Sequence, residues 1–182
     1  MIEVFDDFLT QDETMNLWEV LKGGTWTLEE GIQYLKKEME IAGGGCNHLV
    51  EFTNPKEKIY KVILDRLYEL PILKGKYILH YASRNAYKVG DMGGVHQDSA
   101  DVTALIYGNP IWHINWGSET IFTDSYSKDS EIIASIIPKP GRLVVFDSKI
   151  PHTGRAPNPA YVNHRFSVAY NFNKIQPHDK IN

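Results

Sequence analysis

The spacing of apolar residues predicts a short strand followed by a helix at the start of the chain. Residues 2–9, IEVFDDFL, are typical of a strand. Thr10 and Glu13 have the spacing at which a helix N-cap and the third helical residue exchange hydrogen bonds. Apolar side chains then recur at helical spacing, at Met15, Trp18 and Leu21. The Gly23-Gly24 pair predicts the end of this helix.

A second helix is predicted after Asn54, which is a good N-cap and precedes Pro55 in the first turn. One face of this segment is apolar, through Ile59, Ile63, Leu67 and Leu70. A helix with one apolar face packs on something flat, and we expect that to be a sheet. Pro71 predicts its end.

The segment between the two helices has no clear period. Residues 26–41 mix charged and apolar side chains and are expected to form a strand or irregular structure. The triplet Gly43–Gly45, followed by Cys46, predicts a flexible joint. One hypothesis is that this joint acts as a lid over a binding site.

From residue 76 onward, short apolar runs separated by Gly and Pro predict strands. These runs are 76–88, 102–107, 111–122, 131–137, 142–147 and 164–172. Helices followed by many strands favour an α+β, mainly β fold, in which a sandwich or barrel is backed by N-terminal helices.

Alternation along the last predicted strand separates two kinds of side chain. One face is apolar and belongs to the core: Phe166, Val168, Tyr170 and Phe172. The other face is small and polar, with one cation at its end: Arg165, Ser167, Ala169 and Asn171. An arginine binds a carboxylate with two parallel hydrogen bonds, and a neighbouring serine adds a third, so this face suits a cavity for a small acid.

Composition bounds the class of protein without naming a partner. The 182 residues are 42% hydrophobic, which is enough for one domain with a core. The net charge is −4 and no basic block occurs, so neither nucleic-acid nor membrane binding gains support. A single cysteine excludes an intrachain disulfide and fits a reducing, cytoplasmic setting. We expect neither a signal peptide nor a membrane-spanning helix.

The pair His96 and Asp98 is the first candidate for metal chemistry. In an extended segment both side chains leave the same face, and a nitrogen and an oxygen donor side by side suit a divalent metal such as iron. A further histidine would complete a facial triad. His152 follows an apolar strand far along the chain and is the favoured third ligand. His113 and His164 compete for this position, but they fit a wall residue and a loop residue better.

Several ordered motifs together resemble the Fe(II)- and 2-oxoglutarate-dependent dioxygenases, and among them the prolyl 4-hydroxylase branch. The motifs are Tyr87-x-x-Gly90-x5-His96-x-Asp98, Trp116-Gly-Ser-Glu-Thr-Ile-Phe122, Pro138-Lys-Pro-Gly-Arg-Leu-Val-Val-Phe146, Pro151-His152 and Arg165-Phe-Ser167. The resemblance covers about residues 75–172, and the opening IEVFDDFLTQDE is also similar to that branch.

This resemblance implies a double-stranded β-helix with His96, Asp98 and His152 as catalytic iron ligands. It also implies a 2-oxoglutarate site, formed by Arg165, Ser167, Tyr87 and Tyr107, with Arg165 holding the distal carboxylate. The implied cofactors are Fe(II), 2-oxoglutarate, O2 and ascorbate as a reductant. The whole chain, 1–182, would form a single dioxygenase domain, with 1–74 as helical support and 75–172 as the β-helix core.

The implied reaction is hydroxylation of a C–H bond, in a prolyl or other amino-acid residue of a peptide or protein. Asp98 favours hydroxylation over halogenation, since related halogenating enzymes lack this carboxylate. Candidate residues on the substrate side are Arg84, Trp112, His113, Trp116 and Arg155. The alternatives are a small-metabolite or nucleobase oxygenase of the same superfamily, a non-enzymatic cupin-like metal-binding module, and a zinc hydrolase.

Overall fold

A computed structural model describes residues 1–31, 46–56, 58–91 and 93–176 of the chain. The helices are α1 (Gln11–Lys22), α2 (Lys58–Glu69) and the 3-10 helix η1 (Ile114–Trp116). The strands are β1 (Ile2–Phe5), β2 (Thr27–Gly31), β3 (Cys46–Phe52), β4 (Tyr77–Tyr87), β5 (Val102–Tyr107), β6 (Thr120–Thr123), β7 (Ile132–Ile136), β8 (Leu143–Asp147), β9 (His152–Gly154) and β10 (Arg165–Lys174).

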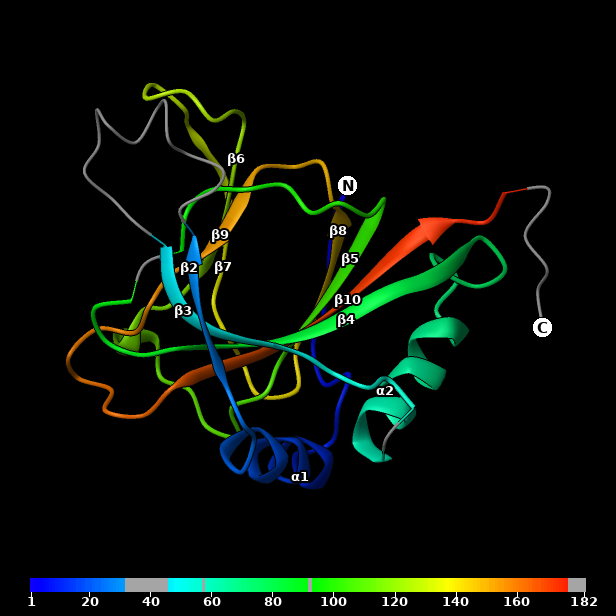
Figure 1. Ribbon diagram of the computed structural model, residues 1–182, viewed down its shortest axis with the longest axis horizontal. Helices are drawn as coiled ribbons and strands as arrows, with labels where there is room; N and C mark the ends of the chain where they lie inside the picture. Colours follow the sequence, from blue (N-terminus) through cyan, green and yellow to red (C-terminus); the bar gives the residue numbers. More distant parts are fainter. Residues whose placement is uncertain (32–45, 57, 92, 177–182) are drawn as a thin grey trace.

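The strands form two antiparallel sheets that face each other (Figure 1). The large sheet has seven strands in the order β1-β8-β5-β10-β4-β3-β2, and the small sheet has the order β7-β6-β9. Apolar side chains from both sheets meet between them: Leu105, Tyr107, Phe122, Ala134, Ile136, Val144, Phe146 and Ala169. The prediction of a mainly β, α+β fold backed by two helices is confirmed.

Helix α1 begins as the sequence predicts. The Thr10 hydroxyl accepts a hydrogen bond from the Glu13 backbone N–H at 3.2 Å, and the Thr10 N–H donates to the Glu13 carboxylate at 2.9 Å. The buried face, however, consists of Thr14, Leu17 and Leu21. Met15 is 43% exposed, because the helix is rotated so that its leucines pack on the large sheet.

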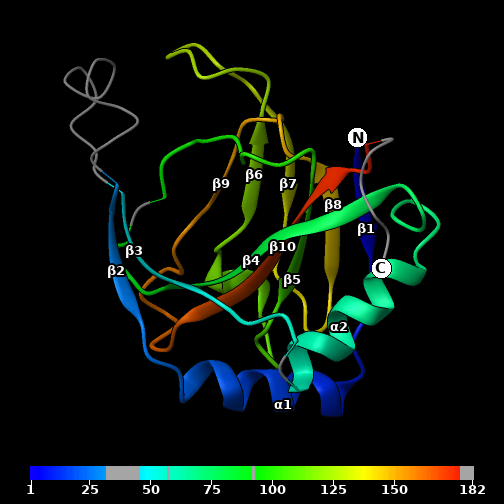
Figure 2. The same cartoon turned by 45° about the vertical axis from the view of Figure 1, so that its right-hand side comes forward.

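Helix α2 begins later than predicted. The Asn54 side chain accepts a hydrogen bond from the Lys56 N–H at 3.1 Å, which closes a turn, and α2 starts at Lys58. The apolar face is as predicted, with Ile59, Ile63 and Leu67 buried. Figure 2 shows both helices on the outer face of the large sheet, opposite the small sheet.

The apolar face of β10 is the centre of the core beneath the helices. Phe166, Val168, Tyr170 and Phe172 are buried together with residues of α1 and α2. Trp18 meets Phe166 edge to face at a centroid distance of 5.2 Å, and Trp26 stacks on the same ring at 5.5 Å. The two faces of β10 are therefore separated as the alternation predicted, and the polar face is turned toward the small sheet.

Most strand predictions hold to within two residues, but the run 111–122 is wrong in its first half. Residues 114–116 form η1, and the strand starts only at Thr120. Trp116 leaves the extended path because its ring packs on Tyr161, 4.5 Å between centroids, and Gly117 turns the chain at φ +67°. Strand β9 lies inside a stretch predicted to be a loop.

The remaining sequence predictions fall between α1 and α2. Residues 27–31 form β2, which pairs with β3, so part of the ambiguous segment 26–41 is a strand. The glycine triplet and its lid hypothesis lie outside the described residues. Within the described ranges, neither α-helix has the length and apolar character needed to cross a bilayer.

Candidate metal centre and co-substrate pocket

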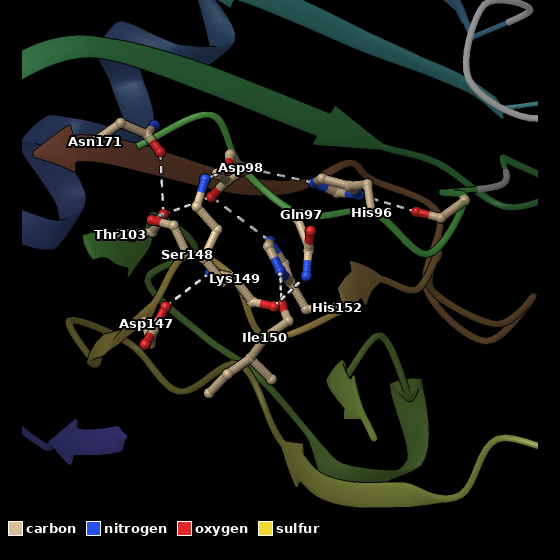
Figure 3. A network of polar contacts seen from close by, with 11 residues as sticks. His96, Gln97, Asp98, Thr103, Asp147, Ser148, Lys149, Ile150, His152 and Asn171 are labelled. Atoms are coloured by element: carbon tan, nitrogen blue, oxygen red, sulfur yellow. Dashed lines mark hydrogen bonds and ion pairs between the residues drawn. The ribbon is translucent and has the colours of Figure 1, made fainter. Parts of the chain in front are cut away.

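The structure brings His96, Asp98 and His152 together, as Figure 3 shows. Each residue offers one ligand atom, and these atoms all lie within 4.8 Å of one another. His96 and His152 form an isolated antiparallel bridge, with both N–H to carbonyl distances at 2.9 Å. No other group of three potential metal ligands of this kind occurs among the described residues.

Backbone carbonyls set the orientation of both imidazole rings. The Nδ1 atom of His96 is 2.9 Å from the Gly94 carbonyl, and the Nδ1 atom of His152 is 2.9 Å from that of Ile150. A carbonyl only accepts, so each Nδ1 carries the hydrogen and each Nε2 keeps its lone pair. The two Nε2 atoms lie 3.5 and 3.7 Å from the Asp98 carboxylate, so all three donors converge on one point.

Electrostatics keep this donor set in the protonation state that a metal needs. His152 is buried, and burial together with the adjacent His96 lowers its pKa to about 4, against the attraction of Asp98. Burial alone would raise the pKa of Asp98, but the adjacent imidazoles of His96 and His152 hold that pKa below the ordinary value. At neutral pH the site therefore presents a neutral imidazole at His152 and a carboxylate at Asp98.

A hydroxyl network behind Asp98 fixes its carboxylate. Thr103, on β5, donates to Asp98 Oδ2 at 2.5 Å, and its oxygen lies 2.8 Å from the Ser148 hydroxyl. Asn171, on the polar face of β10, is 3.0 Å from the same threonine oxygen. The sequence analysis did not single out Thr103 or Ser148. Outer partners of this kind orient metal-binding carboxylates.

The donor set fits a ferrous ion. Two imidazole nitrogens and one carboxylate on one side of a cation leave the opposite side open, which is the ligand arrangement of non-haem Fe(II) oxygenases. The Asp98 side chain is largely buried while His96 is 48% exposed, so the open side meets a cavity rather than the core.

A cavity of about 1020 Å³ extends from these ligands between the two sheets. Its far end is lined by Arg165, Ser167, Tyr87 and Thr120, and by Gly154 of β9. Tyr107 lies directly beneath this end without lining it. The structure thus places Arg165, Ser167 and Tyr87 in the same cavity as the three ligand candidates.

Arg165 is 1% exposed, and its guanidinium is bonded only to neutral groups. It donates to the Ser167 hydroxyl at 3.0 Å and to the Thr120 hydroxyl at 2.8 Å. Its Nε has no hydrogen-bond partner, and no described carboxylate forms an ion pair with it. A buried cation without a counter-charge is costly, so this end of the cavity is built to receive an anion.

Two tyrosines, on the strands that flank β10, have their rings next to the guanidinium. Its central carbon lies 5.1 Å from the ring centre of Tyr107 and 5.4 Å from that of Tyr87, within cation–π range. The Tyr107 hydroxyl donates to the Thr120 oxygen at 2.8 Å, and burial raises the pKa of Tyr107. Thr120 thus lies between Arg165 and Tyr107, and the Tyr107 hydroxyl is also 3.3 Å from the Ile136 carbonyl oxygen.

Thr120 is a second residue that the sequence analysis missed. Its position inside the motif Trp116–Phe122 was the available signal, but a hydroxyl alone is too common to mark a site. By contrast, the substrate-side candidates Arg84, Trp112, His113, Trp116 and Arg155 do not line the cavity. Arg84 lies on the opposite face of β4, where it donates to the Thr25 carbonyl and covers the Trp26 ring.

The two histidines that competed for the third ligand position lie elsewhere. His113 is exposed and accepts a hydrogen bond from the Asn115 N–H at 3.1 Å, which caps η1. His164 stacks on Phe166 at 5.6 Å, on the helix side of the large sheet.

A sequence model described as the 2OG-Fe(II) oxygenase superfamily matches residues 74–173. A search among curated proteins found no match. Among solved structures, the chain is similar to a viral collagen prolyl hydroxylase from Paramecium bursaria Chlorella virus-1 at 17% identity, covering 96% of this chain and 90% of that one, with a TM-score of 0.65.

Two further prolyl hydroxylases have a similar structure. The prolyl-4-hydroxylase of Pseudomonas putida is 15% identical over 93% of this chain and 91% of that one, with a TM-score of 0.61. A Trichoplax adhaerens prolyl hydroxylase, in complex with a hypoxia inducible factor oxygen degradation domain peptide, is 16% identical, with coverages of 94% and 82% and a TM-score of 0.62. At these identities the likeness concerns the fold, and it confirms the double-stranded β-helix.

Proposed function

Because the chain belongs to the 2OG-Fe(II) oxygenase superfamily, with Fe(II) and 2-oxoglutarate as its metal and co-substrate, we propose that it hydroxylates a C–H bond in a prolyl or other amino-acid residue of a peptide. The observation that carries the proposal is the presence of two complementary sites in one cavity. One end offers two imidazoles and a carboxylate, and the other offers a buried guanidinium without a counter-charge.

His96, Asp98 and His152 are the proposed iron ligands. When bound, iron and 2-oxoglutarate together activate O2 and couple oxidation of the keto acid to succinate and CO2 with hydroxylation of the substrate. The chain positions these ligands. The Gly94 and Ile150 carbonyls orient the two imidazole rings, and the Thr103 hydroxyl orients the Asp98 carboxylate. The position of Asp98 and His152 between the sheets, where both side chains are largely buried, limits their contact with bulk water.

Arg165 is the proposed anchor for the distal carboxylate of 2-oxoglutarate. Its guanidinium supplies charge, and Ser167 and Thr120 supply hydroxyls on either side of it. The rings of Tyr107 and Tyr87 lie within cation–π distance of it and help to fix its position. The choice of an amino-acid residue as substrate draws support from the prolyl hydroxylases that share the fold. Ascorbate as a reductant stays a prediction.

Addition of Fe(II) and 2-oxoglutarate without oxygen tests this function directly. We expect a visible metal-to-ligand charge-transfer band, and succinate on exposure to oxygen. The His152→Ala variant should lose the band, whereas His113→Ala, a matched histidine outside the cavity, should keep it. A band of full intensity in His152→Ala would show that the ligands are assigned wrongly. The absence of any band in the wild-type protein would refute the function.

A further inference from the structure

The cavity is larger than its iron and co-substrate groups require. At about 1020 Å³ it is at the upper end of the range of about 300–1,000 Å³ for drug-sized ligands, and a five-carbon keto acid leaves much of it free. The co-substrate groups lie on β10 and β5, on the small sheet and at the last residue of β4, Tyr87. The unused part of the floor is formed by β3 and by the part of β4 before Tyr87.

This unused part, here named the β3–β4 face, has a defined composition and register. Val50 lies opposite Asn85, and Phe52 lies opposite Ser83. On the other side of β4, Asn85 is opposite Ser167, so the face borders directly on the proposed co-substrate site. Its cavity-lining members are Val50, Phe52, Tyr81, Ser83 and Asn85.

Two polar side chains of the β3–β4 face make no hydrogen bond to other described residues. Among the described residues, neither the Asn85 amide nor the Ser83 hydroxyl has a hydrogen-bond partner, although both are half-buried in the cavity wall. A half-buried amide loses hydration without compensation unless a ligand supplies partners. The carboxamide of Asn85 offers a donor and an acceptor side by side, which is the pattern that a peptide group complements.

Apolar surface flanks these polar groups at the mouth of the cavity. Phe52 is 73% exposed, and its ring meets that of Tyr81 edge to face at 5.8 Å and 73°. Val50 continues the apolar surface toward Asn85. The rings of Phe52 and Tyr81 therefore offer apolar surface in the cavity wall to a ligand. The edge-to-face pair is not the parallel slot that would hold a flat base between two rings.

The β3–β4 face carries no charge. Among all described residues that line the cavity, the side chains charged at neutral pH are Asp98 and Arg165, apart from the histidine ligands, and both have proposed roles. A charged group placed over Asn85 would be desolvated without an opposite charge. Among the described residues, no lysine or second arginine lines the cavity to receive a phosphate, so this part of the chain offers a nucleotide no anchor there.

From these observations we infer that the β3–β4 face is the primary-substrate subsite, and that it takes an uncharged peptide segment. Asn85 and Ser83 bind the peptide's amide groups, and Phe52, Tyr81 and Val50 contact its apolar side chains. This inference rests on the proposed function, because it assigns the part of the same cavity that the metal and 2-oxoglutarate leave open.

Ligand-observed NMR with saturation transfer tests the inference without turnover. The protein is loaded with Zn(II), which is diamagnetic and replaces iron, and with 2-oxoglutarate. The probes are capped tripeptides, acetyl-Ala-X-Ala-amide, in which X is Pro, Leu or Gln in the neutral set and Asp or Lys in the charged set. Adenosine serves as the nucleobase probe. We expect saturation transfer to at least one neutral peptide, and weaker or no transfer to the charged peptides and to adenosine.

The isosteric variant Asn85→Asp removes the amide donor and adds a charge. It should lower transfer to the neutral peptide by about fivefold or more, as expected for loss of a hydrogen bond of about 1 kcal/mol. It should also favour the Lys peptide over the Asp peptide. The matched variant Asn173→Asp, on β10 outside the cavity, should behave as the wild type. Phe52→Ser, at the exposed rim, should weaken transfer without affecting thermal stability.

The 2-oxoglutarate signals in the same sample separate the two possible failures. If 2-oxoglutarate receives no saturation in the wild-type protein, the proposed function fails. If 2-oxoglutarate receives saturation but no neutral peptide does, the peptide subsite is refuted and the proposed function stands. Transfer to adenosine in place of peptides would assign the subsite to a nucleobase, and equal transfer to neutral and charged peptides, or an unchanged Asn85→Asp variant, would also overturn it.

Discussion

At the scale of single residues, Arg165 and Thr103 show how a buried polar group is held ready for a ligand. Arg165 keeps its charge in the interior with hydroxyl partners only, and Thr103 uses its single hydrogen on the Asp98 carboxylate. Neither arrangement is the most stable that the fold could adopt without ligands, because a buried charge is better satisfied by an opposite charge. Each residue therefore gives a sharp test of the proposed site.

Arg165→Lys should weaken 2-oxoglutarate binding while the protein still folds. An ammonium group keeps the charge but loses the planar fork that grips a carboxylate at two points. We expect the dissociation constant to rise about 10- to 100-fold, corresponding to about 1–3 kcal/mol for hydrogen bonds to charged groups. Titration of the anaerobic charge-transfer band measures this constant. Arg155→Lys, an exposed arginine, is the control, and an unchanged constant in Arg165→Lys would mean that the anchor lies elsewhere.

Thr103→Val should weaken metal binding. Valine keeps the shape of threonine but cannot donate to Asp98, so the carboxylate loses its orienting bond. Loss of such an outer partner typically lowers metal affinity by about 10- to 100-fold. Calorimetric titration with Mn(II) under nitrogen measures the change. Thr103→Ser, which keeps the hydroxyl, should bind the metal within a few-fold of the wild type; equal affinity in the valine variant would remove the proposed role.

Sequence reasoning identified the charged and metal-binding members of this site but not the hydroxyls around them. His96, Asp98, His152 and Arg165 have chemistry that few residues share, and their spacing marks them. Thr103 and Thr120 are ordinary threonines whose roles arise from neighbours on other strands, such as Asp98 and Arg165. Those pairings depend on the register of the sheet, which local pattern does not determine.

At the scale of elements, α1 and α2 are joined by an ion pair as well as by apolar packing. Arg66 of α2 donates to both oxygens of Glu13 in α1, at 2.5 and 3.0 Å, and to the Phe8 carbonyl at 2.6 Å. The hydrogen bond from Arg66, together with the Thr10 cap, lowers the pKa of Glu13 to about 2. The same carboxylate thus caps one helix and ties it to the other.

This ion pair makes stability depend on pH in a defined direction. The Glu13 carboxyl has a lower pKa folded than unfolded, so its contribution is complete above about pH 4.5 and is lost as the pH falls toward 2. Glu13→Gln keeps a capping amide and removes the charge. We expect urea unfolding to show the variant about 1 kcal/mol less stable at pH 7, because solvent partly screens the pair. The difference should shrink toward zero near pH 2.

The exposed pair of Glu19 and Lys22 offers a control for this measurement. Both side chains are about half exposed, so Glu19→Gln should change stability by a few tenths of a kcal/mol at most. If Glu13→Gln behaved like Glu19→Gln at both pH values, the link between the helices would be energetically unimportant.

The elements that the sequence predicted well are those whose pattern is decided locally. Residues 102–107 form β5 with the predicted bounds, because every side chain is buried and turns lie on both sides. The failures involve long-range packing. Residues 111–116 leave the extended conformation where Trp112 and Trp116 gather around Tyr161, a residue that follows much later. The Asn54 side chain closes a turn, so α2 starts at Lys58.

At the scale of the whole molecule, ligand binding should raise the stability of the fold. The proposed ligands come from two segments far apart in the sequence, His96 and Asp98 from one and His152 from the other, and a metal that binds only the folded arrangement stabilises it by mass action. At about 100 times its dissociation constant, a ligand adds about 2.7 kcal/mol, or about 5–10 °C in melting temperature for a chain of this size. Calorimetry with Mn(II) and 2-oxoglutarate, against a chelator-treated sample, measures this shift.

The two histidine variants used to test the metal ligands also test this increase in melting temperature. His152→Ala should lose most of the metal-dependent increase, and His113→Ala should retain it. A metal-dependent increase of equal size in both variants would mean that the stabilising ion binds outside the His96, Asp98 and His152 group.

The sequence predicted the class of the whole molecule better than its connectivity. Helices followed by strands indicated an α+β barrel-like fold, and the motifs indicated the double-stranded β-helix. The strand order was beyond such reasoning: β1, at the start of the chain, pairs with β8, where Ile2 lies opposite Phe146. That pairing joins the start of the chain to a strand far along the sequence, and only the assembled core selects it.

Strand β10 lies between β5 and β4; between residues 165 and 172 its even-numbered residues are in the core and its odd-numbered residues line the cavity. Substitution of a cavity-lining residue of this strand can therefore change the reaction or the substrate while the hydrophobic core stays intact. The cavity side of β10 is thus free to diversify in evolution. Inserting or deleting one amino acid in this strand would swap the two sides. It would bury Arg165 among the helices and push phenylalanine toward the iron, so folding and catalysis would be lost in the same event.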